Sequence, residues 1–471
     1  MALETERVKI NADTRALVIG LGRNGGGAGI VRYLLRAGAT VTVTDTKSAE
    51  ELEGTLAELR EEHGFDEIVF RLGENNLELL EDVETVIKSP GVPYSAPLVE
   101  EARTQGTPVL TDMDLFFRDL EEREGTRPYI IGVTGTRGKS TTSSLIYEFF
   151  KKEGYETYLA GNIGRSVLDI LPFIREHTYV VLELSSFQLE DFPYRPDVGV
   201  ITNLFADHLN RHGSMAEYAR AKRSLIDNQT PQDYAVLNAE QAAVKEMADH
   251  TRAKIRWFGL QAEAPHREAW IENDHIYIQR SRDPICAREE CALSGDHNTK
   301  NLLAALSVAS VLDLSTESMN EVVTHFAGLP DRLEHVRTRG GVSFINDTTS
   351  TMPEATIAAL QAFGDTPMHL IAGGGDKDVS YEELAEWIQT TSVQTVTLLP
   401  GKASDILLSL LRDIPDLDLH MVDSLDRAVH VASENAREGD VVLFSPAATS
   451  FVSFANEFER GEVFRNVVDD I

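Results

Sequence analysis

The chain has 471 residues, and 44 Lys plus Arg against 76 Asp plus Glu give a formal net charge of −32. Nucleic acids are bound mainly through Lys and Arg on their phosphates, and the sequence contains no strongly basic run, so a nucleic-acid partner is not expected. No stretch of about 20 apolar residues is present to span a membrane, and the first residues lack a signal-peptide pattern, so we expect a cytoplasmic protein.

Apolar runs alternate with longer segments of helical period along the whole chain, which is typical of an α/β protein with parallel strands and crossover helices. The length corresponds to about three domains of roughly 150 residues each. A polar, turn-prone segment at 119–128 and the Gly-Leu-Pro sequence at 328–330 separate three such series. We therefore predict three domains over residues 1–111, 112–328 and 329–471.

The predicted strands follow one another in a regular order. They are residues 16–20, 40–45, 85–89, 129–135, 179–185 and 198–204, and later 342–347, 368–374, 395–401 and 441–447. The earlier strands all lead into loops rich in Gly, Ser, Asp or Asn. Because open α/β sheets bind ligands at the carboxyl ends of their strands, we expect the functional residues in these loops.

A first glycine loop, GLGRNG at 20–25, follows the first predicted strand, and Asp45 ends the next strand. This is the pattern of a dinucleotide-binding fingerprint, in which the acidic residue contacts a ribose. Gly26 and Gly27 lengthen the glycine run beyond the usual form. The pattern alone leaves three interpretations open: NAD, another nucleotide, or glycines needed only for the turn.

A second glycine loop, GVTGTRGKST at 132–141, lies between a predicted strand and a predicted helix. In this context, backbone N–H groups and the helix N-terminus bind phosphate. Lys139 would reach the β and γ phosphates, and a following hydroxyl would bind Mg²⁺. Val133 occupies the first glycine position of the strict motif. We predict ATP binding rather than a plain turn, with contacts from Gly135, Thr136, Arg137, Gly138, Lys139, Ser140 and Thr141.

Candidate metal ligands follow this loop. Glu183 comes at the end of one predicted strand and His208 soon after the next, while Lys222 lies on a predicted helix. A carboxylate is the kind of hard oxygen ligand that Mg²⁺ prefers, so Glu183 suits the ion directly. His208 could supplement it, although a lone histidine is more often a surface residue. Lys222 by its sequence context alone looks like a solvated helix residue.

The chain contains two cysteines, Cys286 and Cys291. Two thiols are too few for a disulfide framework or for a zinc site with four thiolates. We expect them to be small, buried or half-exposed side chains without a functional role.

Several motifs occur in the order and approximate spacing of the Mur ligase family. They are the second glycine loop, GNIG at 161–164, ELSSFQLE at 183–190, residues 203–222, GDHNTKNLLAA at 295–305, GLPDRLE at 328–334, FIND at 344–347 and SPAATSF at 445–451. The chain resembles this family over essentially its whole length. The resemblance implies a Rossmann-like N-terminal domain that binds UDP, a central P-loop ATP-binding domain with a mainly parallel sheet, and a Rossmann-like C-terminal domain that binds glutamate. We expect a monomer.

The resemblance also implies a reaction, the ATP-dependent ligation of D-glutamate to UDP-N-acetylmuramoyl-L-alanine (UDP-MurNAc-L-Ala) in peptidoglycan precursor synthesis. The alanyl carboxylate attacks the γ-phosphate of ATP and becomes an acyl phosphate, which the amine of glutamate then attacks as phosphate leaves. Two Mg²⁺ ions and Lys139 would offset the charge that builds on the transferred group.

The resemblance also implies roles for the residues that stand at the positions of the family's functional residues. The catalytic residues are Lys139, Glu183, His208 and Lys222, and the Mg²⁺ ligands are Ser140, Glu183, His208 and Lys222. Further ATP contacts are Asn298, Asn301, Arg332 and Asp347. Substrate contacts are Arg23, Asn24, Asp45 and Thr46 for UDP, Asn162 and Ser185 for the muramoyl part, and Lys377 and Ser450 for glutamate. Lys222 would carry a carbamate, which requires a neutral amine that a lysine with an ordinary pKa of about 10.4 rarely offers near pH 7.

The chain departs from the family at two places. After Asp347 the family usually continues Ser-Lys-Ala-Thr-Asn, whereas here Thr349 replaces the lysine. The phosphate charge must then be offset elsewhere, for which Arg137 is a candidate. The usual phenylalanine seven residues after Ser450 is replaced by Glu457, with a phenylalanine next to it.

These departures keep an alternative substrate open. A related branch of the family with a Thr-Pro continuation joins L-glutamate and leaves a separate epimerase to invert it. Outside the ligases, the first glycine loop by itself would also suit a non-catalytic nucleotide-binding protein or an NAD(P) oxidoreductase. Folylpolyglutamate synthase shares the second glycine loop, but it lacks the separate N-terminal domain.

Overall fold

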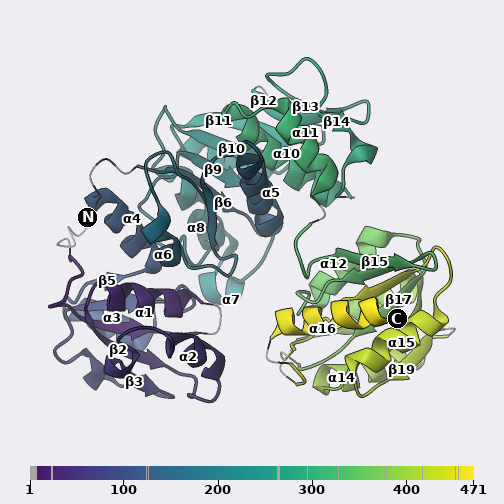
Figure 1. Cartoon of the computed structure of the whole chain (residues 1–471), viewed down its shortest axis with the longest axis horizontal. Coiled ribbons are helices and arrows are strands. Elements are labelled where there is room, and N and C mark those ends of the chain that lie inside the picture. The colour runs from purple at the N-terminus through teal and green to yellow at the C-terminus, as the bar shows by residue number, and fades with distance from the viewer. Residues whose placement is uncertain are drawn as a thin grey trace. The chain divides into compact units, whose positions relative to one another are not determined.

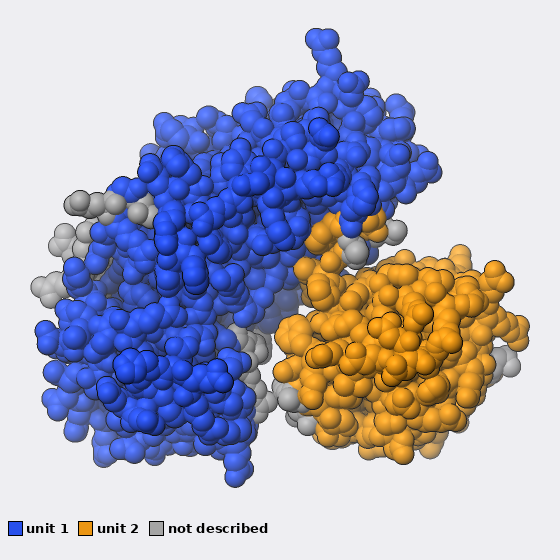
Figure 2. All heavy atoms as spheres, viewed as in Figure 1, with its two compact units in different colours: residues 1–291, 296–325 blue, residues 292–295, 326–471 orange. Residues whose placement is uncertain are grey.

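The computed structural model describes residues 8–22, 25–123, 125, 127–261, 266–293, 295–326, 328–376, 379–415, 417–450, 452–454 and 456–471. The chain forms two compact units, shown in Figure 2, with residues 1–291 and 296–325 in one and 292–295 and 326–471 in the other. Three β-sheets with flanking helices make up these units (Figure 1). The predicted α/β class is confirmed, because most neighbouring strands are parallel.

The first sheet has five parallel strands in the order β3-β2-β1-β4-β5. Its strands are β1 (Arg15–Ile19), β2 (Thr40–Asp45), β3 (Val69–Leu72), β4 (Thr85–Lys88) and β5 (Val109–Leu110). The accompanying helices are α1 (Gly26–Arg36), α2 (Glu53–Leu59) and α3 (Pro97–Thr104). This order is that of a Rossmann-like sheet, as predicted, and the first glycine loop leaves β1 at the point where the order reverses.

The second sheet has nine strands in the order β14-β13-β12-β11-β10-β9-β6-β8-β7, of which β12, β13 and β14 pair antiparallel. They are β6 (Tyr129–Thr134), β7 (Thr157–Gly161), β8 (Tyr179–Glu183), β9 (Val198–Ile201), β10 (Tyr234–Asn238), β11 (Lys254–Gly259), β12 (Arg267–Glu272), β13 (His275–Ile278) and β14 (Cys286–Ala287). The helices are α4 (Asp112–Glu122), α5 (Lys139–Lys152), α6 (Val167–Ile170), α7 (Leu209–His212), α8 (Met215–Asp227), α9 (Ala242–Met247), α10 (Asp296–Val311) and α11 (Thr316–His325).

The third sheet has six strands in the order β15-β16-β20-β17-β18-β19, with only β15 antiparallel to its neighbour among the described pairs. They are β15 (Glu334–Arg339), β16 (Val342–Asn346), β17 (Met368–Ala372), β18 (Val393–Leu398), β19 (Asp418–Met421) and β20 (Val441–Phe444). The helices are α12 (Pro353–Phe363), α13 (Glu382–Thr390), α14 (Lys402–Leu411), α15 (Leu425–Asn435) and α16 (Glu457–Asp470).

The central strands are buried over their whole length, which explains their continuous apolar sequences. All residues of β4, β9, β17 and β20 are buried. This is the pattern of parallel strands covered by helices on both faces. Several predicted strands end earlier than expected, since the residues after Thr134 and Glu183 leave the sheet to form loops.

The segment 119–128 is only partly a turn, in contrast to the prediction, because α4 extends into it as far as Glu122. A capping box starts this helix. Thr111 Oγ1 accepts a hydrogen bond from the backbone N–H of Asp114 at 3.1 Å, and the Asp114 carboxylate accepts one from the Thr111 N–H at 2.8 Å. The helix then buries Phe117 and its neighbours, so local capping and core packing override the polar composition.

Helices α1 and α6 join the layer around the first sheet to that around the second. A Cβ atom at Gly29 of α1 would lie 2.1 Å from Oγ of Ser166, the N-cap residue of α6. One turn further along α1, Arg32 donates two hydrogen bonds to the Asp169 carboxylate, at 2.9 and 2.6 Å. The close approach of the two helices therefore requires a glycine at position 29.

We predict that Gly29→Ala lowers the free energy of unfolding by about 1–3 kcal/mol, because the new methyl group overlaps Ser166. Gly26→Ala is a matched control in the same helix, since no atom lies within 4 Å of its added Cβ. That variant should be neutral or stabilised by up to about 1 kcal/mol. Urea unfolding of both variants measures the difference, and equal stabilities would contradict the proposed overlap.

Candidate active site

The second glycine loop links β6 to α5 and requires its glycines. Gly138 is the N-cap of α5 and has a φ of 78°, in the left-handed region. A Cβ at Gly135 would lie 1.9 Å from Thr202 Oγ1, and one at Gly138 would lie 2.1 Å from Asn301 Oδ1. The loop is therefore packed tightly, with the N-terminus of a fourteen-residue helix directly behind it. This is the arrangement that binds phosphate.

Two residues that the sequence did not single out fix the loop. Asn203 Oδ1 accepts a hydrogen bond from the backbone N–H of Arg137 at 2.8 Å, and Thr202 Oγ1 donates one to the Arg137 carbonyl at 2.7 Å. Asn203 Nδ2 donates to the same carbonyl at 2.8 Å. Both residues follow β9, so their place at the carboxyl end of a parallel strand was the available signal.

Two lysines meet at one carbonyl oxygen of this loop. Lys139 Nζ donates to the Gly135 carbonyl at 3.1 Å, and Lys222 Nζ donates to the same oxygen at 2.7 Å. Lys222 is 1% exposed. Burial first, and then repulsion by Lys139, lower its pKa from 10.5 to about 6, against a smaller opposing attraction from Asp207. Lys222 is therefore a neutral amine near pH 7, which its sequence context did not indicate.

Tyr218 connects this lysine to the glycine loop. It lies four residues before Lys222 on α8, so the two side chains share one face of the helix. Its hydroxyl is 3.1 Å from Thr136 Oγ1, and Lys222 Nζ lies over its ring, 4.7 Å from the centroid. Burial raises the pKa of Tyr218 to about 12, so the hydroxyl stays protonated and can donate.

Glu183 ends β8 with its carboxylate almost fully buried, at 1% exposure. Oε1 accepts a hydrogen bond from Asn162 Nδ2 at 2.8 Å, whereas Oε2 is buried without a hydrogen-bond partner among the described residues. An unpaired buried carboxylate oxygen is costly unless a ligand or ion satisfies it. The structure thus brings together the predicted residues Asn162 and Glu183, and Glu183 fits a metal ligand.

His208 is more exposed than Glu183 and Lys222. Its side chain is 49% exposed, and Nε2 lies 3.6 Å from the Asp207 carboxylate. Its ring lies 5.0 Å from that of Phe187. Within the described part of the chain, no three His, Cys, Asp or Glu side chains converge to hold a metal ion. The predicted ligand set also needs the hydroxyl of Ser140, in the first turn of α5, and a modified Lys222.

The remaining predicted residues of the first unit lie on α10, at the end of β2 or in the loops that follow strands. Asn301 contacts Gly138, and Asn298 lies one turn earlier on the same helix. Ser185 Oγ lies 3.1 Å from Gln188 Oε1 and donates to it. Asp45 is buried and accepts hydrogen bonds from the backbone N–H groups of Gly22, at 3.0 Å, and Lys47, at 2.9 Å. The exposed Thr46 follows it, and Arg23 and Asn24 are outside the described residues.

In the second unit, Asp347 is a buried carboxylate with several partners. It accepts hydrogen bonds from Ser350 Oγ at 2.6 Å, Ser445 Oγ at 2.7 Å and the Leu333 N–H at 3.1 Å. Burial raises its pKa to about 6. Arg332, predicted beside it, is exposed. Through these hydrogen bonds, Asp347 stabilises the loop after β16 and links it to Leu333 and Ser445.

Ser450 and Thr349 lie on neighbouring loops of this unit. The Ser450 hydroxyl is buried without a hydrogen-bond partner among the described residues, which marks it as a group that a ligand could satisfy. Thr349, in the place of the usual lysine, donates its hydroxyl to the Asp331 carbonyl at 2.8 Å, so it serves the loop itself. Lys377 lies outside the described residues.

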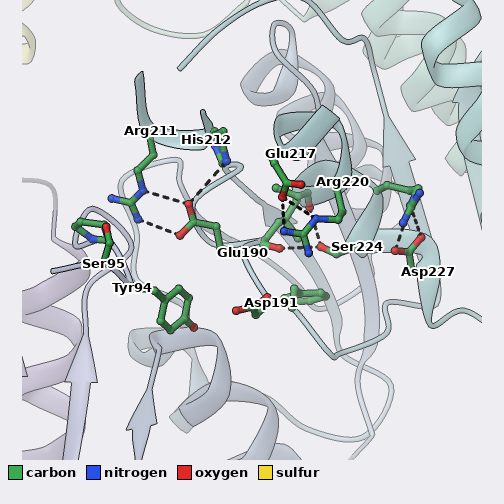
Figure 3. Close-up of a pocket in the computed structure, with 15 residues that line it drawn as sticks. Tyr94, Ser95, Glu190, Asp191, Arg211, His212, Glu217, Arg220, Ser224 and Asp227 are labelled. Carbon is green, nitrogen blue, oxygen red and sulfur yellow. Dashed lines mark hydrogen bonds and ion pairs between the residues drawn. The ribbon is translucent and has the colours of Figure 1, made fainter. Parts of the chain in front are cut away.

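The first unit also contains a cavity of about 440 Å³ (Figure 3). Tyr94 comes from the layer of the first sheet, while Glu190, Arg211 and α8 supply other walls. Arg211 donates to both oxygens of Glu190, at 3.1 and 3.0 Å. The described lining includes neither Glu183 nor the two lysines at the glycine loop. The chemistry predicted from the sequence therefore lies outside this cavity.

Models of three protein domains match successive parts of the chain. The Mur ligase MurD-like N-terminal domain matches residues 14–111, the Mur ligase middle domain 133–309, and the Mur ligase glutamate ligase domain 331–448. A relative from Roseiflexus sp. (strain RS-1), named "UDP-N-acetylmuramoylalanine--D-glutamate ligase", is 38% identical over 97% of this chain and 99% of its own. A protein of the same name from Clostridioides difficile (strain 630) is 34% identical over 97% and 98%.

Solved structures share the fold at lower identity. The UDP-N-acetylmuramate-alanine ligase MurC from Thermotoga maritima superposes with a TM-score of 0.61 at 20% identity, covering 97% of this chain and all of its own. A MurF ligase from the same organism, in complex with ADP, gives a TM-score of 0.55 at 18% identity, covering 99% and 98%. Both likenesses concern the fold.

We predict that the buried amine of Lys222 makes the free energy of unfolding depend on pH. In the unfolded chain this lysine is protonated up to its ordinary pKa of 10.5, whereas in the folded protein it is neutral above about pH 6. Unfolding therefore takes up a proton in this window, and the free energy of unfolding rises with pH by at most about 1.4 kcal/mol per pH unit. Lys222→Met should lose this part of the slope.

Urea unfolding between about pH 7 and pH 9, in buffer free of carbon dioxide, measures the two slopes. Lys151→Met is the matched control, because the Lys151 side chain is 60% exposed and should leave the slope unchanged. Parallel pH profiles for the parent protein and Lys222→Met would show that the amine is not neutral in the folded state.

Proposed function

This chain belongs to the Mur ligase family, and on that premise we propose that it joins D-glutamate to UDP-MurNAc-L-Ala at the expense of ATP, in peptidoglycan precursor synthesis. The observation that carries the proposal is the convergence of the glycine loop, Lys139, Lys222 and Glu183 at the carboxyl ends of adjacent parallel strands. Such a site suits phosphoryl transfer, which depends on positioning and charge. We also propose that the enzyme is cytoplasmic and monomeric.

In the proposed reaction, the alanyl carboxylate attacks the γ-phosphate of ATP, and ADP leaves. The acyl phosphate that forms is then attacked by the amine of glutamate, and phosphate leaves as the amide bond forms. The glycine loop and the N-terminus of α5 would hold the phosphates through backbone N–H groups, with Lys139 and the exposed Arg137 beside them. Asn298 and Asn301 would contact the nucleotide from α10.

Glu183, Ser140, His208 and Lys222 would hold Mg²⁺. The unpartnered Oε2 of Glu183 fits this role, since it is a buried carboxylate oxygen that no described hydrogen bond satisfies. When bound, Mg²⁺ would offset the negative charge of the phosphates. Asn162 keeps Glu183 oriented through Oε1, and Tyr218 keeps Lys222 against the glycine loop.

Lys222 would act as a carbamate. Its neutral amine attacks carbon dioxide, an N–C bond forms, and a proton leaves to solvent, so that a buried amine becomes an anionic oxygen ligand. The lowered pKa supports this assignment, because only the unprotonated amine reacts. The negative charge would also attract the ammonium group of Lys139, which donates to the same carbonyl oxygen as Lys222.

The substrates would be bound by loops of both units. The first glycine loop, with Arg23, Asn24, Asp45 and Thr46, would hold UDP rather than NAD, and Asn162 and Ser185 would contact the muramoyl part. In the second unit, Arg332 and Asp347 would complete the ATP site, and Lys377 and Ser450 would hold glutamate. The unsatisfied hydroxyl of Ser450 supports its role. The three predicted domains, over residues 1–111, 112–328 and 329–471, would thus bind mainly UDP, ATP and glutamate respectively, with the muramoyl part and ATP each contacted by a second domain.

The proposal predicts phosphate release from ATP only when UDP-MurNAc-L-Ala and D-glutamate are both present with Mg²⁺. A phosphate assay with mass spectrometry of the product measures it. Replacement of D-glutamate by L-glutamate should reduce the rate at least about tenfold. A rate supported by L-glutamate alone would instead assign the chain to the alternative substrate, and NAD binding without ligation would overturn the proposal.

A matched pair of variants assigns the activity to this site. Lys139→Ala should lower kcat by about 10²–10³, because a charge that stabilises the transferred phosphate is lost. Lys151→Ala, on the exposed side of the same helix, should keep the parent activity.

The carbamate has a test of its own. Enzyme prepared and assayed without carbon dioxide should be several-fold less active, and bicarbonate should restore its activity. Lys222→Met should be inactive with or without bicarbonate, since it has no amine to modify. An activity that is independent of bicarbonate would contradict the carbamate while leaving the ligase assignment in place.

A further inference from the structure

The two cysteines of the chain lie next to each other. Cys286 Sγ and Cys291 Sγ are 3.7 Å apart, and both thiols are free. The expectation that they are buried or half-exposed holds, since Cys286 is 5% exposed and Cys291 is partly buried. The ligase reaction proposed above uses neither thiol, and the glycine loop and Glu183 lie elsewhere on the sheet.

The local fold brings the thiols together. Cys286 belongs to β14, which pairs with β13 through Ile276. A single 3₁₀ turn, Arg288–Glu290, then reverses the chain, and the backbone N–H of Cys291 donates to the Arg288 carbonyl at 3.2 Å. The turn thus brings the sulfur atoms of two residues five positions apart into van der Waals contact. In a disulfide the two sulfur atoms would be about 2.05 Å apart.

The two thiols differ in access and in acidity. Cys291 Sγ donates a hydrogen bond to the Ala287 carbonyl oxygen at 3.8 Å, and in its contact with Cys286 either sulfur can be the donor. The hydrogen bond with Cys286, together with the nearby Arg288, lowers the pKa of Cys291 against opposition from burial and Glu290. The same hydrogen bond and burial raise the pKa of Cys286. Cys291 is therefore the more exposed and more easily ionised thiol, and Cys286 is its buried neighbour.

We propose that Cys286 and Cys291 form a reversible redox site that reacts with low-molecular-weight disulfides, with Cys291 as the attacking thiol and Cys286 as the resolving thiol. In proteins kept in a reducing compartment, disulfides are usually transient and redox-sensing, and a close pair of unequal thiols suits such a role.

The chemistry balances in two exchanges. The Cys291 thiolate attacks one sulfur of the small disulfide, a mixed disulfide forms at Cys291, and one small thiolate leaves. Cys286 then loses its proton and attacks the Cys291 sulfur, the internal disulfide forms, and the second small thiolate leaves. The protein dithiol is oxidised, and one small disulfide is reduced to two thiols.

The position of the pair gives the modification a structural consequence. Arg288, between the two cysteines, forms an ion pair with Asp296, the first residue of α10. The same helix carries Asn301, which contacts Gly138 of the glycine loop. The internal disulfide would close the turn that precedes this helix, and so restrain its first residues.

Oxidised glutathione, added to the native full-length protein, tests the proposal with two matched variants. The parent chain should lose two hydrogens in mass and yield a peptide linking Cys286 to Cys291, and dithiothreitol should reverse this. Cys286→Ser should instead trap one glutathione on Cys291. Cys291→Ser should react at least about tenfold more slowly than Cys286→Ser, because its remaining thiol is buried and less acidic.

Circular dichroism and a thiol count after denaturation show that each variant is folded and fully reduced at the start. Three results would overturn the proposal: glutathione adducts on the parent chain without an internal disulfide, equal rates for the two variants, or a parent chain whose thiols react only after unfolding. None of these results depends on whether the chain ligates glutamate.

Discussion

The candidate active site depends on the packing of two lysine side chains against one backbone carbonyl oxygen. Lys139 and Lys222 both donate to Gly135, and one of them is almost completely buried. Burial, and then repulsion by Lys139, disfavour the protonated form of Lys222, so this amine gives up its proton. The glycine loop, Tyr218 on α8 and the end of β9 are all arranged around this constraint. A lysine that would be costly to bury with a charge is thereby accommodated as a neutral amine.

Much of the architecture follows from the sequence, because its causes are local. Short apolar runs such as 198–201, followed by turn residues, favour strands that are covered on both faces, and the glycines at 135 and 138 indicate a tight turn into a helix. The edge strands β14 and β15 were not predicted, since β14 has only two residues and β15 is mostly exposed and polar. Capping at Thr111 was also missed, so α4 runs further than the polar composition of 119–128 suggested.

The chemistry of the site was only partly accessible from the sequence. Glu183 could be recognised as a carboxylate at a strand end, but its unpaired oxygen and its bond to Asn162 are tertiary facts. The lowered pKa of Lys222 arises from burial and then from Lys139, which lies on a different helix, so it is also a tertiary property. Asn203 begins one of the quoted motifs, but its hydrogen bonds to the backbone of Arg137 could not be read from that motif. The resemblance to a family supplied Lys222, and the structure supplies the physical reason for it.

The joint between α1 and α6 has a consequence for which molecules can be accommodated. Helix α1 starts directly after the first glycine loop, and α6 follows the loop that carries Asn162. A Cβ at Gly25 would lie 3.4 Å from the Gly164 carbonyl oxygen, so the two loops face each other at contact distance. The hydrogen bonds between Arg32 and Asp169 hold α1 against α6, and so fix the distance between the first glycine loop and the loop that carries Asn162. A molecule that touches both loops must therefore match this fixed separation.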